Sequence, residues 1–431
     1  YERRCAELYA AVSADWVAVY GDREHAANMA FCCGFDPRFE EAMLLLGPTD
    51  RRVLLVGNEG VDYVPAVVSM TLEVALCQSF SLMGQPRAAA PSLLAVLRAA
   101  GVGQGAQVGL AGWKYLEPAE SDDPVAPAFV PAMVLSALPG AVGPGGAISD
   151  ATAALMHPAH GLRHRNSAAQ IVRFADTAAR ASAAVLRVVQ GARPGMRERE
   201  AVALMGYQGD PLSCHTMLSA AGGGEPLVGL RSPGDRVLAE GDAITTALGL
   251  QGSLCCRAGL LRAAPDPDFQ ARYVAPYFSA IAAWWGTLRL GLSGDELHRA
   301  VFATLEGATF RPALNPGHLI GLDEWTHSPV RPGSAERIAS GMLLQCDIIP
   351  SPMPLGRALN CEDTVAVADA ALRAELRATA PELWAQIEAR RSFMREALGI
   401  SLADELLPLS LAPAYLMPFW LAPNLVCAVA R

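Results

Sequence analysis

Lysine is almost absent from this sequence. Lys114 is the only lysine, so arginine supplies nearly all of the 34 basic residues, and these do not gather into a stripe. With a formal net charge of -9 at pH 7, the chain lacks the concentrated cationic face that binding to nucleic-acid phosphates requires. We therefore expect no nucleic-acid partner.

Paired-cysteine motifs are missing as well. The ten cysteines occur singly or as the adjacent pairs Cys32 with Cys33 and Cys255 with Cys256, and none forms a C-x-x-C motif. This spacing excludes a zinc knuckle and a thioredoxin-like motif. Unpaired thiols fit a reducing compartment, and the first residues carry no signal-peptide pattern, so we expect a cytoplasmic location.

The sequence has one long uncharged stretch, residues 407–430, but it lacks the uninterrupted helix of a membrane span. Four prolines divide it, and each removes a backbone donor that lipid cannot replace. We expect no membrane partner. The stretch instead predicts an extended tail that is buried against the body of the protein or against a partner subunit.

Apolar runs predict an α/β domain in the first part of the chain. At 431 residues the chain exceeds one ordinary core, so two domains are expected. Buried strands such as 51–60 alternate with helices such as 91–103. This pattern loosens in a Gly-rich and Pro-rich stretch at 139–165. We place the domain boundary near the end of this stretch, which gives domains at 1–160 and 161–431.

The second domain has a different pattern, typical of an α+β arrangement. It opens with a long amphipathic helix that Asn166 or Ser167 caps, and Gly191 ends this helix. Strand hairpins dominate from residue 241 onward. The first of them, residues 241–259, has no acidic side chain after Asp242, although the chain contains 43 Asp and Glu residues.

Three stretches of the second domain resemble the creatinase, aminopeptidase P and prolidase superfamily. They are "GARPGMREREA", "NPGHLIGLDEW" and the pair "SGMLLQCDIIP" and "CEDTVAVAD". The first domain, with "DREHAANMAFCCGFDPRFEEAMLLL", is similar to that family's N-terminal domain, so the resemblance covers most of the chain. It implies a creatinase-like α/β domain, a C-terminal pita-bread domain and a homodimer.

The resemblance also indicates where the metal ligands of the family would lie and which of them this sequence lacks. Metal-dependent members bind two metal ions through two Asp, one His and two Glu, whose positions here hold Ala247, Cys256, His318, Asp347 and Glu362. Both aspartates are replaced, and without their charge two divalent cations would repel one another. We therefore expect no dinuclear metal centre and no cofactor, and the acid-free hairpin is the place of that loss.

The remaining polar residues predict metal-free chemistry. His318, Asp347 and Glu362 are the candidate catalytic residues, with His318 as acid and base and a carboxylate orienting it. The alternative is that His318 only forms hydrogen bonds within a strand-rich core. Creatinase itself works without metal, but the position of its principal histidine holds Leu230 here, so the creatinase reaction is not implied.

Four further residues are expected to bind the substrate: Arg257, His327, Trp325 and Cys256. The expected pocket also includes Asp323. Arg257 either clamps a substrate carboxylate or pairs with Asp347 or Glu362. Trp325 either lines the pocket or packs in the core. Cys256 fits a small buried apolar side chain better than a nucleophile, because no histidine is fixed beside it.

Three functions follow from these residues. The first is a metal-independent hydrolase of a C–N bond, amide or amidine, in a small-molecule or peptide-like substrate. The second is a pseudo-peptidase without catalysis that binds a ligand or partner. The third is a mononuclear zinc hydrolase, in which Cys256, His318 and a carboxylate of Asp347 or Glu362 hold one zinc ion.

Overall fold

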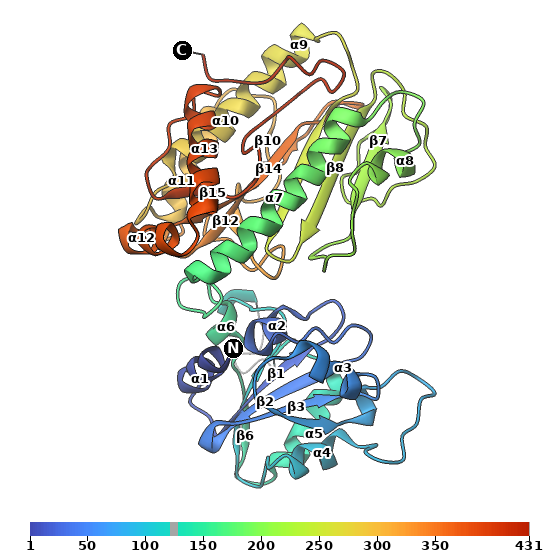
Figure 1. Cartoon of the computed structure of the whole chain (residues 1–431), viewed down its shortest axis with the longest axis vertical. Coiled ribbons are helices and arrows are strands. Elements are labelled where there is room, and N and C mark those ends of the chain that lie inside the picture. The colour runs from blue at the N-terminus through green and yellow to red at the C-terminus, as the bar shows by residue number, and fades with distance from the viewer. Residues whose placement is uncertain (121–127, 431) are drawn as a thin grey trace. The chain divides into compact units, whose positions relative to one another are not determined.

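A computed structural model describes residues 1–120 and 128–430. The chain divides into two compact units, Tyr1–His164 and Arg165–Arg431 (Figure 1). The division falls at residue 164, whereas the sequence pattern places it at 160. Each unit has its own sheet and its own apolar core.

Six strands form the sheet of the N-terminal unit: β1 (Trp16–Gly21), β2 (Ala42–Gly47), β3 (Arg51–Val56), β4 (Glu73–Leu76), β5 (Gln107–Ala111) and β6 (Ala147–Asp150). Their order is β4-β3-β2-β1-β5-β6, and β1 pairs antiparallel with β2 and parallel with β5. Every residue of β1 and β2 is buried, as expected from their continuous apolar runs. Among the described residues of this unit, six α-helices accompany the sheet: α1 (Glu2–Ala11), α2 (Ala27–Cys33), α3 (Gly60–Val67), α4 (Leu93–Ala99), α5 (Ala132–Val142) and α6 (Thr152–Met156).

The C-terminal unit contains a seven-stranded sheet and a separate two-stranded one. The large sheet has the order β11-β12-β14-β9-β8-β7, and β15 also pairs with β14. Its strands are β7 (Met217–Ala221), β8 (Ala243–Leu250), β9 (Ser253–Leu260), β11 (His318–Leu319), β12 (Leu343–Cys346), β14 (Asn360–Val367) and β15 (Leu406–Pro408). The two-stranded sheet pairs β10 (Arg311–Pro312) with β13 (Pro350–Ser351).

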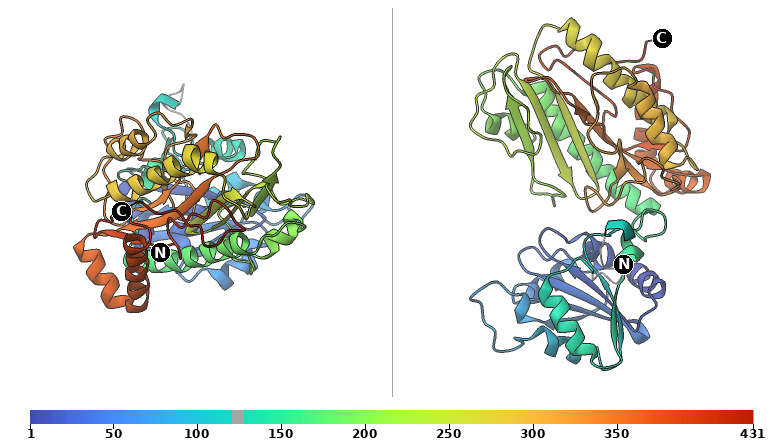
Figure 2. Two further views of the ribbon diagram at one scale, coloured as in Figure 1. Left: turned by 90° about the horizontal axis from the view of Figure 1, so that it is seen from above. Right: turned by 180° about the vertical axis from the view of Figure 1, so that it is seen from behind.

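Helices flank this sheet, and the longest of them is α7. The α-helices are α7 (Ala168–Gly191), α8 (Glu198–Ala203), α9 (Pro267–Phe269), α10 (Ala275–Thr287), α11 (Gly294–Thr304), α12 (Ala370–Thr379) and α13 (Pro381–Glu396). Ser167 caps α7 in a capping box with Gln170, as the sequence predicts for this end of the helix. α7 runs along β8 and β9, which Figure 1 and the rear view in Figure 2 both show.

A tight turn at Gly252 joins β8 to β9. The φ angle of Gly252 is +118°, which a residue with a side chain rarely adopts. A Cβ atom at this position would lie 2.3 Å from Cδ1 of Phe174 on α7. The turn therefore fixes the register of the hairpin beneath α7, and this register aligns the cavity residues described below.

The apolar tail is buried against the body of the C-terminal unit over much of its length. β15 pairs with β14, and Phe419 forms a parallel bridge with Leu260 on β9. Phe419 and Trp420 are almost fully buried. No helix among the described residues is long and apolar enough to cross a membrane.

Candidate active site

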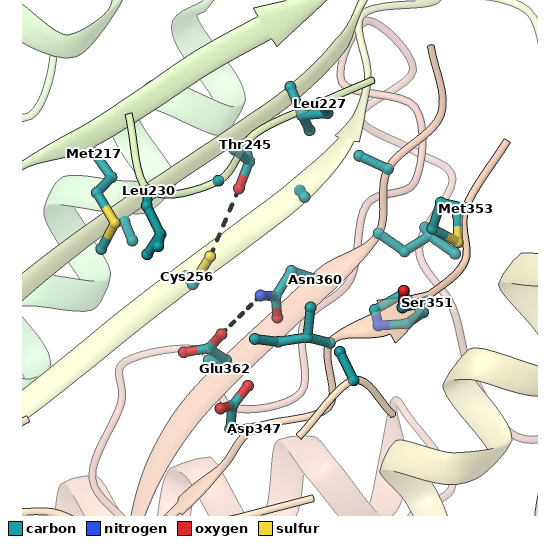
Figure 3. Close-up of a pocket in the computed structure, with 18 of the residues that line it drawn as sticks. Met217, Leu227, Leu230, Thr245, Cys256, Asp347, Ser351, Met353, Asn360 and Glu362 are labelled. Atoms are coloured by element: carbon teal, nitrogen blue, oxygen red, sulfur yellow. Dashed lines mark hydrogen bonds between the residues drawn. The ribbon is translucent and has the colours of Figure 1, made fainter. Parts of the chain in front are cut away.

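A cavity of about 720 Å³ lies against β8, β9 and β14 in the C-terminal unit (Figure 3). Most side chains around it are apolar, and its carboxyl groups gather beside β14. The residues that line it include Met217, Leu227, Leu230, Thr245, Ala247, Leu254, Cys256, Glu324, Trp325, Asp347, Met353, Asn360 and Glu362.

Strand register places three of the expected ligand positions side by side. Cys256 on β9 is directly opposite Ala247 on β8 and directly opposite Glu362 on β14. Directly opposite residues of neighbouring strands point to the same face of a sheet, and all three line the cavity. Asp347 follows β12 and lines the same cavity, so four of the five positions meet there.

Asp347 and Glu362 form a coupled pair of buried carboxyl groups. Burial raises the pKa of Asp347 well above its ordinary value, and the negative charge of Glu362 raises it further. Burial also raises the pKa of Glu362, but hydrogen bonds oppose that rise, including one of 2.7 Å from Asn360 Nδ2 to Glu362 Oε1. Both pKa values are therefore raised, and the surroundings favour a proton on Asp347 more than on Glu362.

His318 lies near Asp347 but does not line the cavity. Its Nδ1 is 3.2 Å from the carbonyl oxygen of Leu319, which can only accept, so Nδ1 carries the proton. Nε2 then offers a lone pair 3.4 Å from Glu324 Oε1 and 4.0 Å from Asp347 Oδ2. The ring stacks on Trp325 with 4.1 Å between the ring centroids.

This environment corrects the expected role of His318. Burial lowers its pKa to about 4, so the imidazole is neutral at pH 7. The carboxyl group beside Nε2 cannot compensate, because the pKa of Glu324 is raised to about 8 and this group is also neutral. A weakly basic ring outside the cavity wall is poorly suited to activate water.

Glu324 is the site residue that the sequence did not reveal. It lines the cavity, whereas its neighbour Asp323 does not. Burial, followed by the charges of Glu362 and Asp323, raises the pKa of Glu324 to about 8. Both acids lie in a loop, where no strand or helix period indicates which side chain points inward; the adjacent Trp325 was the only available signal.

The raised pKa of Glu324 predicts a pH-dependent stability. The folded protein keeps the Glu324 proton up to about pH 8, whereas the unfolded chain loses it near the ordinary value of 4.5. Stability therefore falls as pH rises between these values. In Glu324→Gln this loss is absent, so its melting temperature should exceed that of the wild type by at least about 2 °C at pH 9 and match it near pH 4.5. The exposed Glu375→Gln serves as control, and an equal effect at both pH values would contradict the prediction.

Arg257 lies on the opposite face of β9 and is not part of the cavity lining. Its Nη2 donates to both carboxylate oxygens of Asp363, at 3.0 and 2.9 Å. Its other nitrogens donate to backbone carbonyls, among them Tyr415 O at 2.8 Å and Glu362 O at 2.9 Å. The expected substrate clamp is therefore wrong, and the expected partners Asp347 and Glu362 are replaced by Asp363.

The other expected binding residues divide between cavity and surroundings. Cys256 lines the cavity, and its Sγ is 3.8 Å from Thr245 Oγ1. Burial raises the pKa of this thiol well above its ordinary value, which disfavours a nucleophilic thiolate. Trp325 also lines the cavity. His327 does not, and its carbonyl oxygen accepts a 2.7 Å hydrogen bond from Leu319 N instead.

The donor set does not fit the dinuclear metal centre of metal-dependent relatives. Position 247 offers only a methyl group, and position 256 offers a neutral thiol. The described residues contain no group of three His, Cys, Asp or Glu side chains placed to hold a metal ion. No chemical step is therefore assigned to a metal.

Comparisons with known proteins agree on one family and one fold. Residues 173–369 match the model of metallopeptidase family M24. A prolidase from Pyrococcus horikoshii OT3 superposes with a TM-score of 0.65 at 15% identity, over 85% of this chain and 95% of that one. A comparison with curated protein sequences found no match.

Two further solved structures show the same two-domain architecture. A prolidase from Pyrococcus furiosus has a TM-score of 0.63 at 16% identity, over 86% of this chain and 97% of that one. For an Xaa-Pro dipeptidase from Bacillus anthracis the TM-score is 0.62 at 14% identity, over 85% and 94%. The predicted α/β domain followed by a pita-bread domain is confirmed, and the family match of residues 173–369 together with these folds supports the expected resemblance to the creatinase, aminopeptidase P and prolidase superfamily.

Proposed function

We propose that the cavity of the C-terminal unit hydrolyses a C–N bond, in an amide or amidine, without a metal ion. Peptidase-type hydrolysis is the general chemistry of the M24 family that residues 173–369 match. The observation that carries the metal-free form is the pair Asp347 and Glu362. Two buried carboxyl groups, of which Asp347 has the more strongly raised pKa, stand together at the wall of a cavity that lacks two of the family's metal ligands.

In the proposed reaction one carboxyl group accepts a proton from water and the other donates a proton to the substrate. Glu362 takes a proton from a water molecule as its oxygen attacks the substrate carbon. Asp347 gives its proton to the nitrogen as the C–N bond breaks, so that an amine or ammonia leaves. The proton on Glu362 then passes to Asp347, which restores the starting state. Two carboxyl groups with pKa values pushed apart can act in this way as base and acid.

Two alternative functions rest on other features of the same cavity. Its mostly apolar lining favours a binding protein that has lost catalysis. A mononuclear zinc hydrolase would require Cys256, His318 and a carboxylate of Asp347 or Glu362 to converge, although His318 does not line the cavity. In both alternatives the amide or amidine bond is not cleaved by the carboxyl pair alone.

A substrate screen with metal control tests the proposal. Purified full-length protein, treated with a chelator and checked by elemental analysis, is assayed against amides, amidines and Xaa-Pro dipeptides. We expect the protein to cleave at least one amide or amidine, and we expect chelation to change the rate of this cleavage by less than about twofold. A tenfold change in rate would correspond to about 1.4 kcal/mol. Turnover that disappears with one zinc per chain supports the zinc enzyme, and the absence of turnover supports the binding protein.

Restoring the two lost carboxylates is expected to create a metal site. In Ala247→Asp/Cys256→Asp, two acids would again face Glu362 across the hairpin, because Cys256 is opposite both Ala247 and Glu362. We expect this variant to bind Mn²⁺ or Co²⁺ at least about tenfold more tightly than the wild type, since added carboxylates offset the repulsion between cations. Calorimetric titration with each metal measures the change.

A matched variant controls for the added charge. Thr245 and Ala258 are also directly opposite one another on the same hairpin, and both line the cavity. Thr245→Asp/Ala258→Asp adds two acids at positions two residues further along each strand, where Ala258 is opposite Asn360 instead of Glu362. Equal metal binding by both variants would mean that acidity alone attracts the ions, and the inferred ligand geometry would be wrong.

A further inference from the structure

Hydrogen-bond acceptors dominate one end of the cavity. Asn360 uses its Nδ2 to donate to Glu362, so its Oδ1 remains as an acceptor. Asn360 Oδ1 and Asp347 Oδ1 are both buried and have no hydrogen-bond partner among the described residues. The two side chains are only 8% and 5% exposed, so bulk water does not readily satisfy these atoms.

The carboxyl groups of Glu362 and Asp347 lie at this end of the cavity. Asn360 donates one hydrogen bond to Glu362, whereas Asp347 Oδ1 and Asn360 Oδ1 lack donors among the described residues, and a buried acceptor without a donor is costly. Figure 3 shows Glu362, Asp347 and Asn360 gathered together beside β14. A cationic ligand with several N–H donors would satisfy these acceptor atoms and complement the two carboxyl groups.

Most of the remaining lining is apolar. Met217 and Leu230 lie on one side of the carboxyl end, and Met353 lies on the other (Figure 3). Leu254 and Ile349 extend this surface. Such walls gain free energy by covering an apolar ligand, at about 25 cal/mol for each Å² removed from water, and they offer no hydrogen bonds to a peptide backbone.

Positive charge along the lining is already engaged. Among the described lining residues only Arg357 and His215 are basic. Arg357 Nη2 donates to Asp266 Oδ2 at 3.2 Å, and its guanidinium lies over the ring of Phe269. His215 Nε2 lies 2.7 Å from the carbonyl oxygen of Leu230. A ligand carboxylate would compete with these contacts.

We propose that the cavity binds an apolar compound with one cationic head of several N–H donors, an amine or amidine, and discriminates against carboxylates. The head lies against Glu362, Asp347 and Asn360, and the body against Met217, Leu230 and Met353. This inference rests on the proposed function, since it names the substrate class of the same site. It differs from a dipeptide preference, because a dipeptide carries a terminal carboxylate.

Four probes test the inference by calorimetric titration of the full-length protein. They are 4-phenylbutylamine, 4-phenylbutanamidine, 4-phenylbutanoate and butylamine, so that head and body vary separately. We expect the first two to bind at least about tenfold more tightly than the carboxylate and than butylamine, which lacks the aromatic body. Equal binding of the carboxylate, equal binding of butylamine, or no binding of any probe at millimolar concentration would overturn the inference.

A charge variant at the cavity lining checks the location. Leu230 lines the cavity and is 76% exposed, so Leu230→Arg should fold. It should weaken 4-phenylbutylamine binding several-fold and strengthen binding of 4-phenylbutanoate. Leu411→Arg, at an exposed position outside the lining, should change neither. Equal effects of the two variants would place the ligand elsewhere.

The proposed ligand class and the proposed hydrolase can be refuted separately. If the amine and amidine bind but no amide or amidine is cleaved, the ligand class stands and the proposed hydrolase falls. If a metal-free preparation cleaves a dipeptide and ignores the amine probes, the hydrolase stands and the ligand class falls.

Discussion

Asp363→Ala is expected to lower the free energy of unfolding of the C-terminal unit by about 3–5 kcal/mol, because it leaves a buried arginine without its counter-ion. Arg257 Nη2 lies 2.9 Å from Asp363 Oδ2, and the two side chains are 2% and 1% exposed. Asp363 Oδ2 also accepts a 2.8 Å hydrogen bond from Ala414 N in the tail. The substitution therefore removes the charge partner and loosens the tail, which urea unfolding followed by tryptophan fluorescence should detect.

Two further variants separate the buried pair from an ordinary salt bridge. In Arg257→Met/Asp363→Leu both charges are absent, so part of the lost stability should return. Arg272 and Asp268 form an exposed bridge, with 54% and 73% of their side chains accessible, and Arg272→Ala should change stability by less than about 0.5 kcal/mol. A loss below about 1 kcal/mol in Asp363→Ala would mean that Arg257 is held mainly by carbonyl groups.

Strand alternation explains both the success and the error in the β9 prediction. The resemblance placed Cys256 in the cavity, and the structure agrees. Successive residues of a strand point to opposite faces, so a cavity that contains Cys256 must exclude Arg257. The same alternation on β14 turns Glu362 toward the cavity and Asp363 toward Arg257. The sequence alone contained this information, and the expected pairing of Arg257 with Glu362 did not use it.

The loop residues were harder to predict for a physical reason. Neither helix nor strand period governs residues 321–326, so the inward turn of Glu324 depends on tertiary packing. The burial of His318 likewise leaves no mark in the sequence. Nearby carboxylates were expected to raise its basicity, but burial lowers the pKa of His318 to about 4 and neutralises Glu324 beside it. The largely apolar hairpin at 241–259 predicted β8 and β9 well, and both faces of these strands are buried.

Glu362→Gln is expected to reduce kcat by about 10²–10⁴-fold on any amide or amidine that the wild type cleaves, because it removes the proposed general base. Gln keeps the shape of the side chain and its contact with Asn360, so the fold should persist. Its melting temperature should equal or exceed that of the wild type, since a buried carboxylate is replaced by a neutral group. Stopped assays at saturating substrate measure kcat separately from any weaker binding.

The comparison that decides the role of Glu362 is between kcat and stability. A carboxylate that only supports the fold would, when replaced, lower the melting temperature and affect kcat through loss of folded protein. A general base would leave the melting temperature intact while kcat falls. Glu375→Gln makes the same chemical change on the exposed surface of α12 and should leave both quantities unchanged. If Glu362→Gln retains more than about a tenth of wild-type kcat, a loss below the 10²-fold that general bases usually contribute, the cavity breaks the C–N bond by another group.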